Sequence, residues 1–283
     1  MEGIHMKFQI DHDLHIHSYI SPCAGYDPRQ TKEAILAYGL TNQYGLLCVT
    51  DHIWDRSVPS PPPVNNPWLK RGLDCQKAQE ILPLPQRDKC RFLFGIEVDM
   101  DYLGNVGISE KSYDTFDFII LSPSHLHLQG FTRNAASVGS SAAEFKAFYH
   151  ERLLQILNMA LPFHKCGLAH FTSCLTCNEG KVAAIDQFTD EEFRNIFALA
   201  AKRGIGIELN QWEFATQYTP QEQESILRPY RIAKEMGCKF YLGGDAHSPE
   251  EFAPRKEEFR LLIDLLALTE DDKHPFVKEN IAK

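Results

Sequence analysis

The sequence predicts an α/β domain built on a parallel β-sheet. Short runs rich in Val, Ile, Leu and Phe recur along the chain, and each is followed by a longer stretch with helical spacing. Near-continuous hydrophobicity over five or six residues is typical of parallel strands that are covered on both faces. Alternation of such strands with helices indicates βαβ units, so the sheet is either open or closed into a barrel. No linker interrupts the pattern, and we expect a single domain over residues 1–283.

Seven strands and six helices follow from this pattern. The stretch from Thr189 to Gly204 shows how a helix is recognised. Thr189 can cap its start, acidic residues fill the first turn, basic residues fill the last turn, and Gly204 ends it. The expected strands are 10–16, 46–51, 92–98, 117–122, 167–171, 204–209 and 239–244, and the expected helices are about 28–44, 72–82, 141–160, 189–203, 220–237 and 250–267.

Composition excludes several classes of protein and partner. Of the 283 residues, 43% are hydrophobic and 24% are charged, as in an ordinary globular protein. The net charge of −9, without any run of five basic residues, argues against a long nucleic acid as the main partner. The longest apolar runs, such as 118–121, are too short to span a bilayer, so no membrane partner is expected. The N-terminus lacks an apolar signal region and the eight cysteines are scattered, which favours a reducing cytoplasm.

Metal-capable or acidic side chains stand at the end of almost every expected strand. His15 and His17 end the first strand, and their spacing of two residues puts both side chains on one face. The carboxyl ends of parallel strands point to one rim of the fold, where active sites form. The other candidates at this rim are His52, Glu97, His125, His170, Glu208, Asn210, Asp245 and His247.

Imidazole and carboxylate groups together suit Zn²⁺, Mn²⁺ or Fe²⁺. The candidates at the rim exceed the four ligands of one tetrahedral ion, so we expect two or three divalent metal ions. Glu97 has two carboxylate oxygens and could bridge two of them.

The ordered motifs DLHIHS, TDH, GIEVD, SPSH, LAH and GGDAH, spread over residues 11–247, resemble those of the PHP (polymerase and histidinol phosphatase) family. The resemblance implies a distorted (β/α)7 barrel with a bi- or trinuclear metal cluster that hydrolyses phosphoesters. It implies one metal at His15, His17, Glu97 and Asp245, and a second at Glu97, His125 and His170, with Glu97 bridging. A third metal would use His52, His247 and a residue from the loop after His17.

That loop residue is where the sequence departs from the family. Several phosphatases of the family carry a histidine eight residues after the first His of HxH, and here the position is Cys23. Three alternatives remain open: Cys23 binds the metal as a thiolate, Cys23 is a small buried residue beside a binuclear site, or Asp27 replaces it. Two other cysteines, Cys174 and Cys177, form a single CxxC motif, which without a second pair favours a loop of the pocket over a metal site.

Two other pairs of polar residues have open roles. His127 lies two residues after His125 and could replace it as the ligand, although the resemblance favours His125, with His127 in contact with substrate or solvent. Glu208 and Asn210 could orient ligands without touching the metal, or Glu208 could simply be buried and paired.

A phosphate group needs positive charge beyond the metals. Arg133 lies after the fourth expected strand, Lys181 after the fifth and Arg255 after the seventh, so these three are the candidate substrate-binding residues.

The predicted function is metal-dependent hydrolysis of a phosphate ester on a small molecule, with histidinol phosphate among the candidate substrates. Two metals would activate a water and neutralise the phosphate oxygens. Asp245 or His247 would pass the proton to the leaving oxygen. The alternatives are a phosphodiesterase or exonuclease acting on nucleotides, and a metal-binding module without catalysis. Amide hydrolysis on a related barrel is disfavoured because those barrels have eight strands. The pattern leaves the substrate, the metal and the oligomeric state open.

Overall fold

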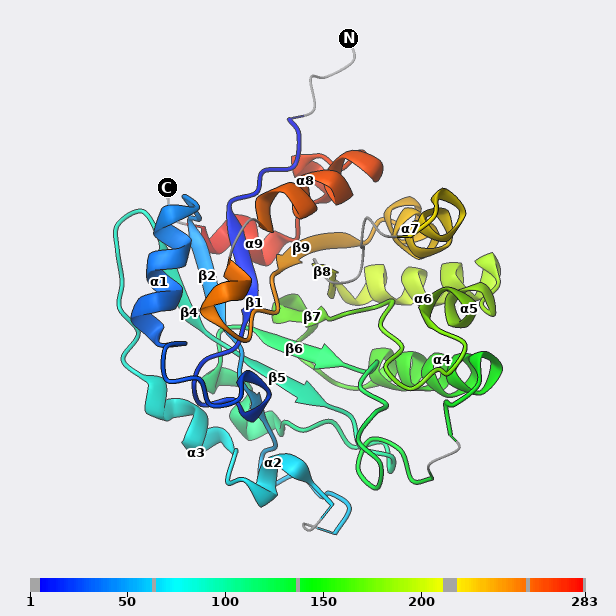
Figure 1. Ribbon diagram of the computed structural model, residues 1–283, viewed down its shortest axis with the longest axis horizontal. Coiled ribbons are helices and arrows are strands. Elements are labelled where there is room, and N and C mark those ends of the chain that lie inside the picture. Colours follow the sequence, from blue (N-terminus) through cyan, green and yellow to red (C-terminus); the bar gives the residue numbers. More distant parts are fainter. Residues whose placement is uncertain (1–5, 63–64, 136–137, 211–217, 253–254, 282–283) are drawn as a thin grey trace.

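Two parallel β-sheets form the centre of the computed structural model, which describes residues 6–62, 65–135, 138–210, 218–252 and 255–281 (Figure 1). Within these residues, the three-stranded sheet has the order β1-β2-β4 and the six-stranded sheet the order β3-β5-β6-β7-β8-β9. The strands are β1 His12–Ile16, β2 Leu46–Val49, β3 His52–Ile53, β4 Arg91–Phe94, β5 Ile96–Asp99, β6 Ile119–Ser122, β7 Cys166–Leu168, β8 Gly206–Asn210 and β9 Lys239–Gly243. The prediction of an α/β protein with parallel strands is confirmed.

One of the seven expected strands is broken, so the prediction of an unbroken strand at 92–98 was wrong: it splits into β4 and β5. The strand expected at 46–51 is observed as β2, and the short strand β3 that follows it was not expected. β2 pairs with β4 in one sheet and β3 pairs with β5 in the other, so the chain passes from one sheet to the other at both places. Backbone hydrogen bonds continue across the break, from Gly95 N to Val49 O at 2.9 Å and from Glu97 N to Asp51 O at 3.1 Å. Gly95 is needed at the break, because a Cβ there would lie 2.6 Å from the carbonyl oxygen of Phe118.

The first and last strands meet at their carboxyl ends. Asp245 N donates to His15 O at 2.6 Å, and His17 N donates to Ala246 O at 3.0 Å. A parallel bridge also joins Ile16 to Ala246. These bonds bring residues that lie about two hundred positions apart in the sequence to the same side of the fold.

Helices cover the sheets from outside, with α4 to α7 together on one side and α1 to α3 on the other (Figure 1). The helices are α1 Lys32–Thr41, α2 Pro67–Lys70, α3 Cys75–Ala78, α4 Ala142–Asn158, α5 Lys181–Asp186, α6 Asp190–Arg203, α7 Pro220–Glu235, α8 Arg255–Leu265 and α9 Pro275–Asn280. No helix in the described part of the chain is both long and apolar enough to cross a membrane.

Capping explains where the helices begin and end. The Thr189 side chain accepts a hydrogen bond from Glu192 N, and Gly204 ends α6 with a φ of 75°, as the sequence predicts. The helix expected from residue 28 begins only at Lys32, because the Thr31 side chain caps it by accepting from Ala34 N. The short helices α2, α5 and α9 were not expected.

The apolar core has two parts. The larger cluster lies between the strands and the surrounding helices. The smaller cluster consists of strand residues together with Phe276 and Val277 of α9. Several strands supply both a residue of this smaller cluster and a candidate metal ligand. The cluster residue then precedes the candidate ligand in the sequence, as Leu14 precedes His15. The apolar filling thus stands towards the amino ends of the strands and leaves their carboxyl ends for polar groups.

Candidate metal centre

The innermost group of the centre consists of His15, His17, Glu97 and Asp245. The Nε2 atoms of His15 and His17 lie 3.2 Å apart. Glu97 Oε2 lies 3.2 Å from His15 Nε2 and 3.3 Å from His17 Nε2. Asp245 Oδ1 lies 3.3 Å and 3.1 Å from the same two nitrogens. The side chains of the two histidines and Glu97 are almost completely buried, and that of Asp245 is 17% exposed.

Glu97 also faces a second set of imidazoles. Its Oε1 lies 3.2 Å from His170 Nε2 and 3.9 Å from His125 Nε2, and it accepts a hydrogen bond from the Ser122 hydroxyl. Its Oε2 lies 3.2 Å from His52 Nε2. One carboxylate therefore reaches the innermost group with one oxygen and His125 and His170 with the other, as the bridging role predicted for it requires.

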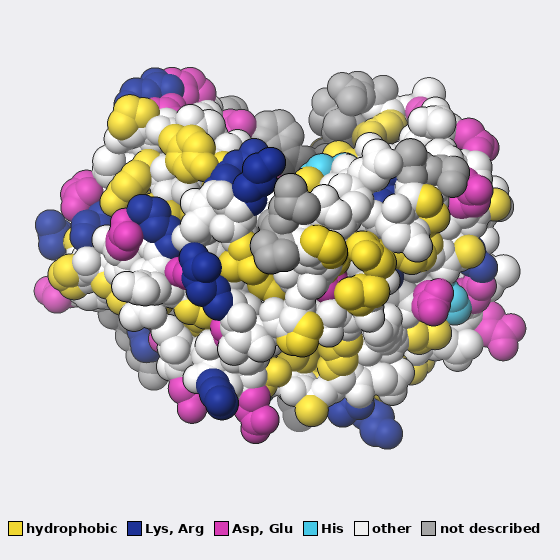
Figure 2. All heavy atoms as spheres, turned by 90° about the horizontal axis from the view of Figure 1, so that it is seen from below, with side chains coloured by type: hydrophobic (Ala, Val, Ile, Leu, Met, Phe, Trp, Pro, Cys, Tyr) yellow, Lys and Arg dark blue, Asp and Glu magenta, His cyan; other side chains and the backbone are white. Residues whose placement is uncertain are grey.

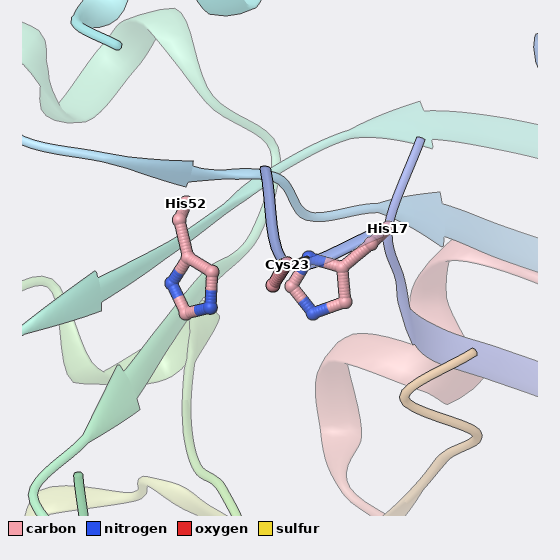
Figure 3. A group of neighbouring side chains, drawn as sticks. All are labelled: His17, Cys23 and His52. Carbon is pink, nitrogen blue, oxygen red and sulfur yellow. Dashed lines mark hydrogen bonds between the residues drawn. The ribbon is translucent and has the colours of Figure 1, made fainter. Parts of the chain in front are cut away.

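Three more residues lie on the outer side of His17. Its ring stacks on that of His247, with centroids 4.3 Å apart, and on that of His52, with centroids 5.0 Å apart. Cys23 Sγ lies 3.7 Å from His17 Nδ1, and a ring nitrogen of His52 points towards this side (Figure 3). The Cys23 thiol has a pKa well below its ordinary range, because the charges of His17 and His52 outweigh the opposing effect of desolvation.

Carboxylates that contact the Nδ1 side of the candidate histidine ligands fix the orientation of the histidine rings. Glu208 is completely buried, and its oxygens lie 2.6 Å from His15 Nδ1 and 2.8 Å from the His170 backbone N–H. Asn210 Nδ2 donates to the same carboxylate at 3.2 Å. Such a carboxylate fixes the tautomer of a histidine and turns its other nitrogen towards a metal. Glu208 is buried and paired, and because its partner His15 is a candidate ligand, the same contact also fits the orienting role.

Asp99 has the same role behind His125. Its Oδ1 lies 2.9 Å from His125 Nδ1, and its Oδ2 accepts a hydrogen bond from Trp68 Nε1 at 2.6 Å. The Trp68 ring stacks on His52, with centroids 4.4 Å apart and planes 7° apart. Sequence reasoning assigned no role to Asp99 or Trp68. A signal for Asp99 existed, since it lies two residues after Glu97 and therefore on the same face of β5.

Two candidate ligands have strained backbones. His170 has a φ of 38° and Asp245 a φ of 50°, in the left-handed region that costs a side-chain-bearing residue about 1–2 kcal/mol. Each lies two residues after the end of a strand, and its backbone N–H donates a hydrogen bond, to the Glu208 carboxylate from His170 and to the His15 carbonyl oxygen from Asp245. Non-glycine residues in this conformation cluster at functional sites, where the surrounding structure imposes it.

The electrostatics of the centre call for a cation. Burial raises the pKa of Glu97, but the His52 and His15 imidazoles outweigh this and hold it well below its usual range. Burial lowers the pKa of His15, but the carboxylates of Asp245, Glu208 and Glu97 raise it well above its ordinary value. In the described part of the chain, Glu97, Asp245, Glu208 and Asp99 form ion pairs with histidines and with no lysine or arginine. Buried carboxylates without a permanent positive partner are costly unless a metal neutralises them.

The geometry of the donor atoms fits divalent ions. Two nitrogen or oxygen ligands about 2.0–2.1 Å from a tetrahedral zinc lie about 3.3 Å from each other. The separations of 3.1–3.3 Å in the innermost group match this value. Among the residues that the structure describes, five sets of three offer ligand atoms within 4.8 Å of one another: His15, His17 and Glu97; His15, His170 and Glu208; His52, Glu97 and His125; His17, Asp245 and His247; and His17, Cys23 and His52.

The other expected site residues lie apart from these sets. Arg133 Nη1 donates to the carbonyl oxygens of Ala135 and Val138 in its own loop. Lys181 begins α5, and the Arg255 side chain lies outside the described residues. The binding of phosphate by these three side chains stays a prediction.

Three further residues with open roles also lie outside the sets. His127 is exposed, and its ring packs edge-on against His125, with centroids 5.2 Å apart. The Asp27 carboxylate is bonded to Arg29. Cys174 and Cys177 form a turn in which Cys177 N donates to Cys174 O. None of the eight cysteines forms a disulfide within the described part of the chain.

The sequence matches no model of a known protein family and no curated protein. Among solved structures, the chain is similar to the histidinol phosphate phosphatase of Lactococcus lactis subsp. lactis, determined with zinc, L-histidinol and phosphate. The TM-score is 0.55 at 16% identity, over 93% of this chain and 98% of that one. It is also similar to the putative histidinol phosphatase of Listeria monocytogenes, with a TM-score of 0.59 at 16% identity over 86% and 97% of the two chains. At this identity the comparisons establish that the chain shares its α/β fold with these proteins.

Proposed function

We propose that the chain is a metal-dependent phosphoric ester hydrolase that acts on a small phosphorylated molecule. The observation that carries this proposal is the position of Glu97, whose two oxygens each face a different set of imidazoles. This is the arrangement that a carboxylate bridging two ions needs. The fold shared with two histidinol phosphatases supports the choice of phosphate esters over other substrates.

The proposed scaffold is one domain over residues 1–283, a distorted (β/α)7 barrel. The order of strand pairing supports it. β1 pairs with β2, β2 with β4, β3 with β5, and from β5 to β9 each strand pairs with the next along the chain. Between the last strand, β9, and the first strand, β1, the backbone hydrogen bonds from Asp245 to His15 and from His17 to Ala246 support closure of the barrel.

We assign one ion to His15, His17, Glu97 and Asp245, and a second to Glu97, His125 and His170. When bound, the ions supply an activated water and neutralise charge on the phosphate oxygens. Glu208 and Asp99 keep the Nδ1 atoms of His15 and His125 engaged, so that Nε2 of each ring faces inward.

Proton transfer to the leaving oxygen is assigned to Asp245 and His247. The His247 ring is 29% exposed, and its Nδ1 lies 2.8 Å from the Asp245 carbonyl oxygen, so the ring is held at the centre within reach of substrate and solvent. In Figure 2 a histidine side chain is visible at the base of a notch in the surface, with Lys or Arg side chains beside it. Arg133, Lys181 and Arg255 remain the candidates for binding the phosphate.

The test is turnover and metal content of the purified protein loaded with Zn²⁺, Mn²⁺ or Fe²⁺. The substrates are a generic phosphomonoester and histidinol phosphate, and the variants are His15→Ala, Glu97→Ala and Glu235→Ala. We expect the first two to lose bound metal and at least about 100-fold in kcat, since loss of an outer partner alone costs 10- to 100-fold. Glu235 is exposed on α7, so Glu235→Ala should behave as wild type. Turnover that persists unchanged in both His15→Ala and Glu97→Ala would remove the proposal.

The same assay separates the alternatives. A mononucleotide, a cyclic phosphodiester and an oligonucleotide are compared as substrates. Preference for the cyclic or polymeric diester would indicate that the chain is a phosphodiesterase or exonuclease and not a phosphatase. Bound metal without turnover on any of these phosphates would indicate a metal-binding module. Charges of both signs are interspersed on the face shown in Figure 2, which supports a small substrate over a long nucleic acid.

A further inference from the structure

Trp68 is a buried aromatic residue that contacts the metal centre from the segment after β3. It is 6% exposed, and its ring stacks on that of His52 with centroids 4.4 Å apart and planes 7° apart. Its Nε1 donates a hydrogen bond to Asp99 Oδ2 at 2.6 Å, and Asp99 Oδ1 in turn lies 2.9 Å from His125 Nδ1. One indole therefore contacts one candidate ligand directly and reaches a second candidate ligand through a carboxylate.

The His52 ring lacks the polar contact that fixes the other candidate histidine ligands. Its Nε2 lies 3.2 Å from Glu97 Oε2, but its Nδ1 is buried without a hydrogen-bond partner among the described residues. The Nδ1 atoms of the other five each lie near an oxygen: His15 near Glu208 at 2.6 Å, His17 near Ser21 at 3.4 Å, His125 near Asp99 at 2.9 Å, His170 near Ser124 at 3.2 Å and His247 near the Asp245 carbonyl at 2.8 Å. A flat indole packed parallel to the imidazole restricts rotation of the ring, so the stack supplies the orientation that a hydrogen bond supplies elsewhere.

Trp68 is itself held in place by its own segment. The Asn66 side chain caps α2 and accepts a hydrogen bond from Trp68 N at 3.1 Å. Leu73 N donates to Trp68 O at 2.9 Å, and Leu73 O accepts from Trp54 N at 3.1 Å. Trp54 follows two residues after His52, so these bonds tie the segment that carries the indole to the chain that carries the imidazole. A residue that orients others must be fixed by its surroundings, and Trp68 meets that need.

We propose that Trp68 is a positioning residue that holds His52 and His125 in the orientation in which they bind an ion together with Glu97. These three residues form one of the metal-capable sets. The stack acts on His52, whereas the hydrogen bond to Asp99 acts on His125, because it engages one carboxylate oxygen and leaves the other facing the ring. This role rests on the proposed function, since it concerns the same centre, but it governs metal binding and involves no substrate.

The experiment measures zinc binding by the intact protein. Trp68→Phe keeps an aromatic ring beside His52 but has no N–H, and Trp68→Leu removes both the ring and the N–H. Each variant is also combined with Asp99→Ala. Trp54→Phe is the matched control, because Trp54 is also buried and its Nε1 also donates a hydrogen bond, to Val58 O at 3.2 Å. The readouts are bound zinc per chain over a range of chelator-buffered Zn²⁺ concentrations, and urea unfolding of the metal-free proteins.

We expect Trp68→Phe to weaken the binding of one zinc equivalent by about 10-fold, the lower end of the loss typical for an outer partner of a ligand. Trp54→Phe should leave zinc affinity unchanged, and its unfolding gives the structural cost of replacing a buried indole. In the Asp99→Ala protein, Trp68→Phe should cause no further loss of affinity, because the carboxylate through which the N–H acts is already absent. Trp68→Leu should still weaken binding there, since the stack on His52 does not depend on Asp99.

Wild-type zinc affinity in Trp68→Phe would overturn this role, and so would an equal loss of affinity in Trp54→Phe. A loss from Trp68→Phe that is the same with and without the Asp99 carboxylate would show a merely structural residue. If Trp68→Leu adds no loss in the Asp99→Ala protein, the stack does not orient His52. The expected pattern of zinc affinities without turnover of any phosphate ester would reject the proposed function alone, whereas turnover with wild-type zinc affinity in Trp68→Phe would reject the positioning role alone.

Discussion

Glu208 illustrates how much of the centre depends on a residue that need not touch a metal. Its two oxygens are shared among His15 Nδ1, the His170 backbone N–H and Asn210 Nδ2. One oxygen fixes the ring of one candidate ligand, and the other fixes the strained backbone of another. Loss of the negative charge should therefore disturb two ligands at once.

We predict that Glu208→Gln lowers metal affinity or kcat by about 10- to 100-fold, the cost typical of losing an outer partner of a ligand. A glutamine of the same size has one acceptor oxygen, so it can satisfy His15 or His170 but not both. Chelator competition measures the affinity, and Glu235→Gln, an exposed change on α7, is the control. Equal zinc affinity and equal kcat in Glu208→Gln and wild type would show that the carboxylate has no orienting role.

At the scale of elements, the carboxyl end of β9 is packed against β8 and β1 without spare room. A Cβ on Gly243 would lie 2.0 Å from Glu208 Oε1 and 2.9 Å from His15 Cβ. The strand can come this close to the centre only because a glycine ends it. A side chain here would have to push β9 away from the two residues that orient the innermost group.

We predict that Gly243→Ala destabilises the metal-free protein by about 1–3 kcal/mol, the usual cost of overpacking, and also weakens metal binding. Gly237→Ala is the control, since nothing lies within 4 Å of its Cβ but its φ of +83° strains any side chain. That variant should lose about 1–2 kcal/mol without a change in metal affinity. Urea unfolding and zinc titration of both variants check this, and wild-type zinc affinity in Gly243→Ala would contradict it.

The ends of the strands are also where sequence and structure can be compared most usefully. His15 and His17 are recognisable because two imidazoles two residues apart interrupt an apolar strand, a local pattern. The change of sheet between β2 and β3 is not recognisable, because Thr50 and Asp51 look like the end of a strand, and only the pairing of β2 with β4 and of β3 with β5 reveals that a second sheet begins there. Glu97 contacts Nε2 of His15, as a fellow ligand would, whereas Glu208 contacts Nδ1 of the same ring and so fixes its orientation. The spacing of the two glutamates in the sequence does not predict which ring atom each one contacts.

At the scale of the whole molecule, the two ends of the fold have different tasks. The carboxyl ends of the strands carry the metal-capable residues, whereas α9 packs Phe276 and Val277 into the smaller core cluster near the amino ends. His274 ties α9 in place, because its backbone N–H donates to Phe240 O at 2.8 Å and its Nε2 donates to Gly204 O at 3.0 Å. Stability at this end can therefore be measured separately from metal binding.

The acid sensitivity of the fold should depend on His274, which is 1% exposed. Burial lowers its pKa to about 4, and the charges of His12 and His164 act in the same direction, whereas the bond to Gly204 opposes them. Its Nδ1 is buried without a hydrogen-bond partner among the described residues, so a proton there would have nothing to bond to. An unfolded histidine takes up its proton near pH 6.5. The stability due to neutral His274 is thus complete above that pH and is lost as the pH falls towards 4.

We predict that this residue alone makes the metal-free protein about 2 kcal/mol less stable at about pH 5 than at about pH 8. His274→Gln keeps a donor that can reach Gly204 O but does not titrate, so its free energy of unfolding should fall less over the same interval. The measurement is urea unfolding of both proteins at both pH values in the presence of a chelator. All other titrating groups are common to the two proteins, so the difference between their acid losses isolates His274. Equal acid losses would mean that the buried ring accepts a proton in the folded protein as readily as in the unfolded chain, which its burial should prevent.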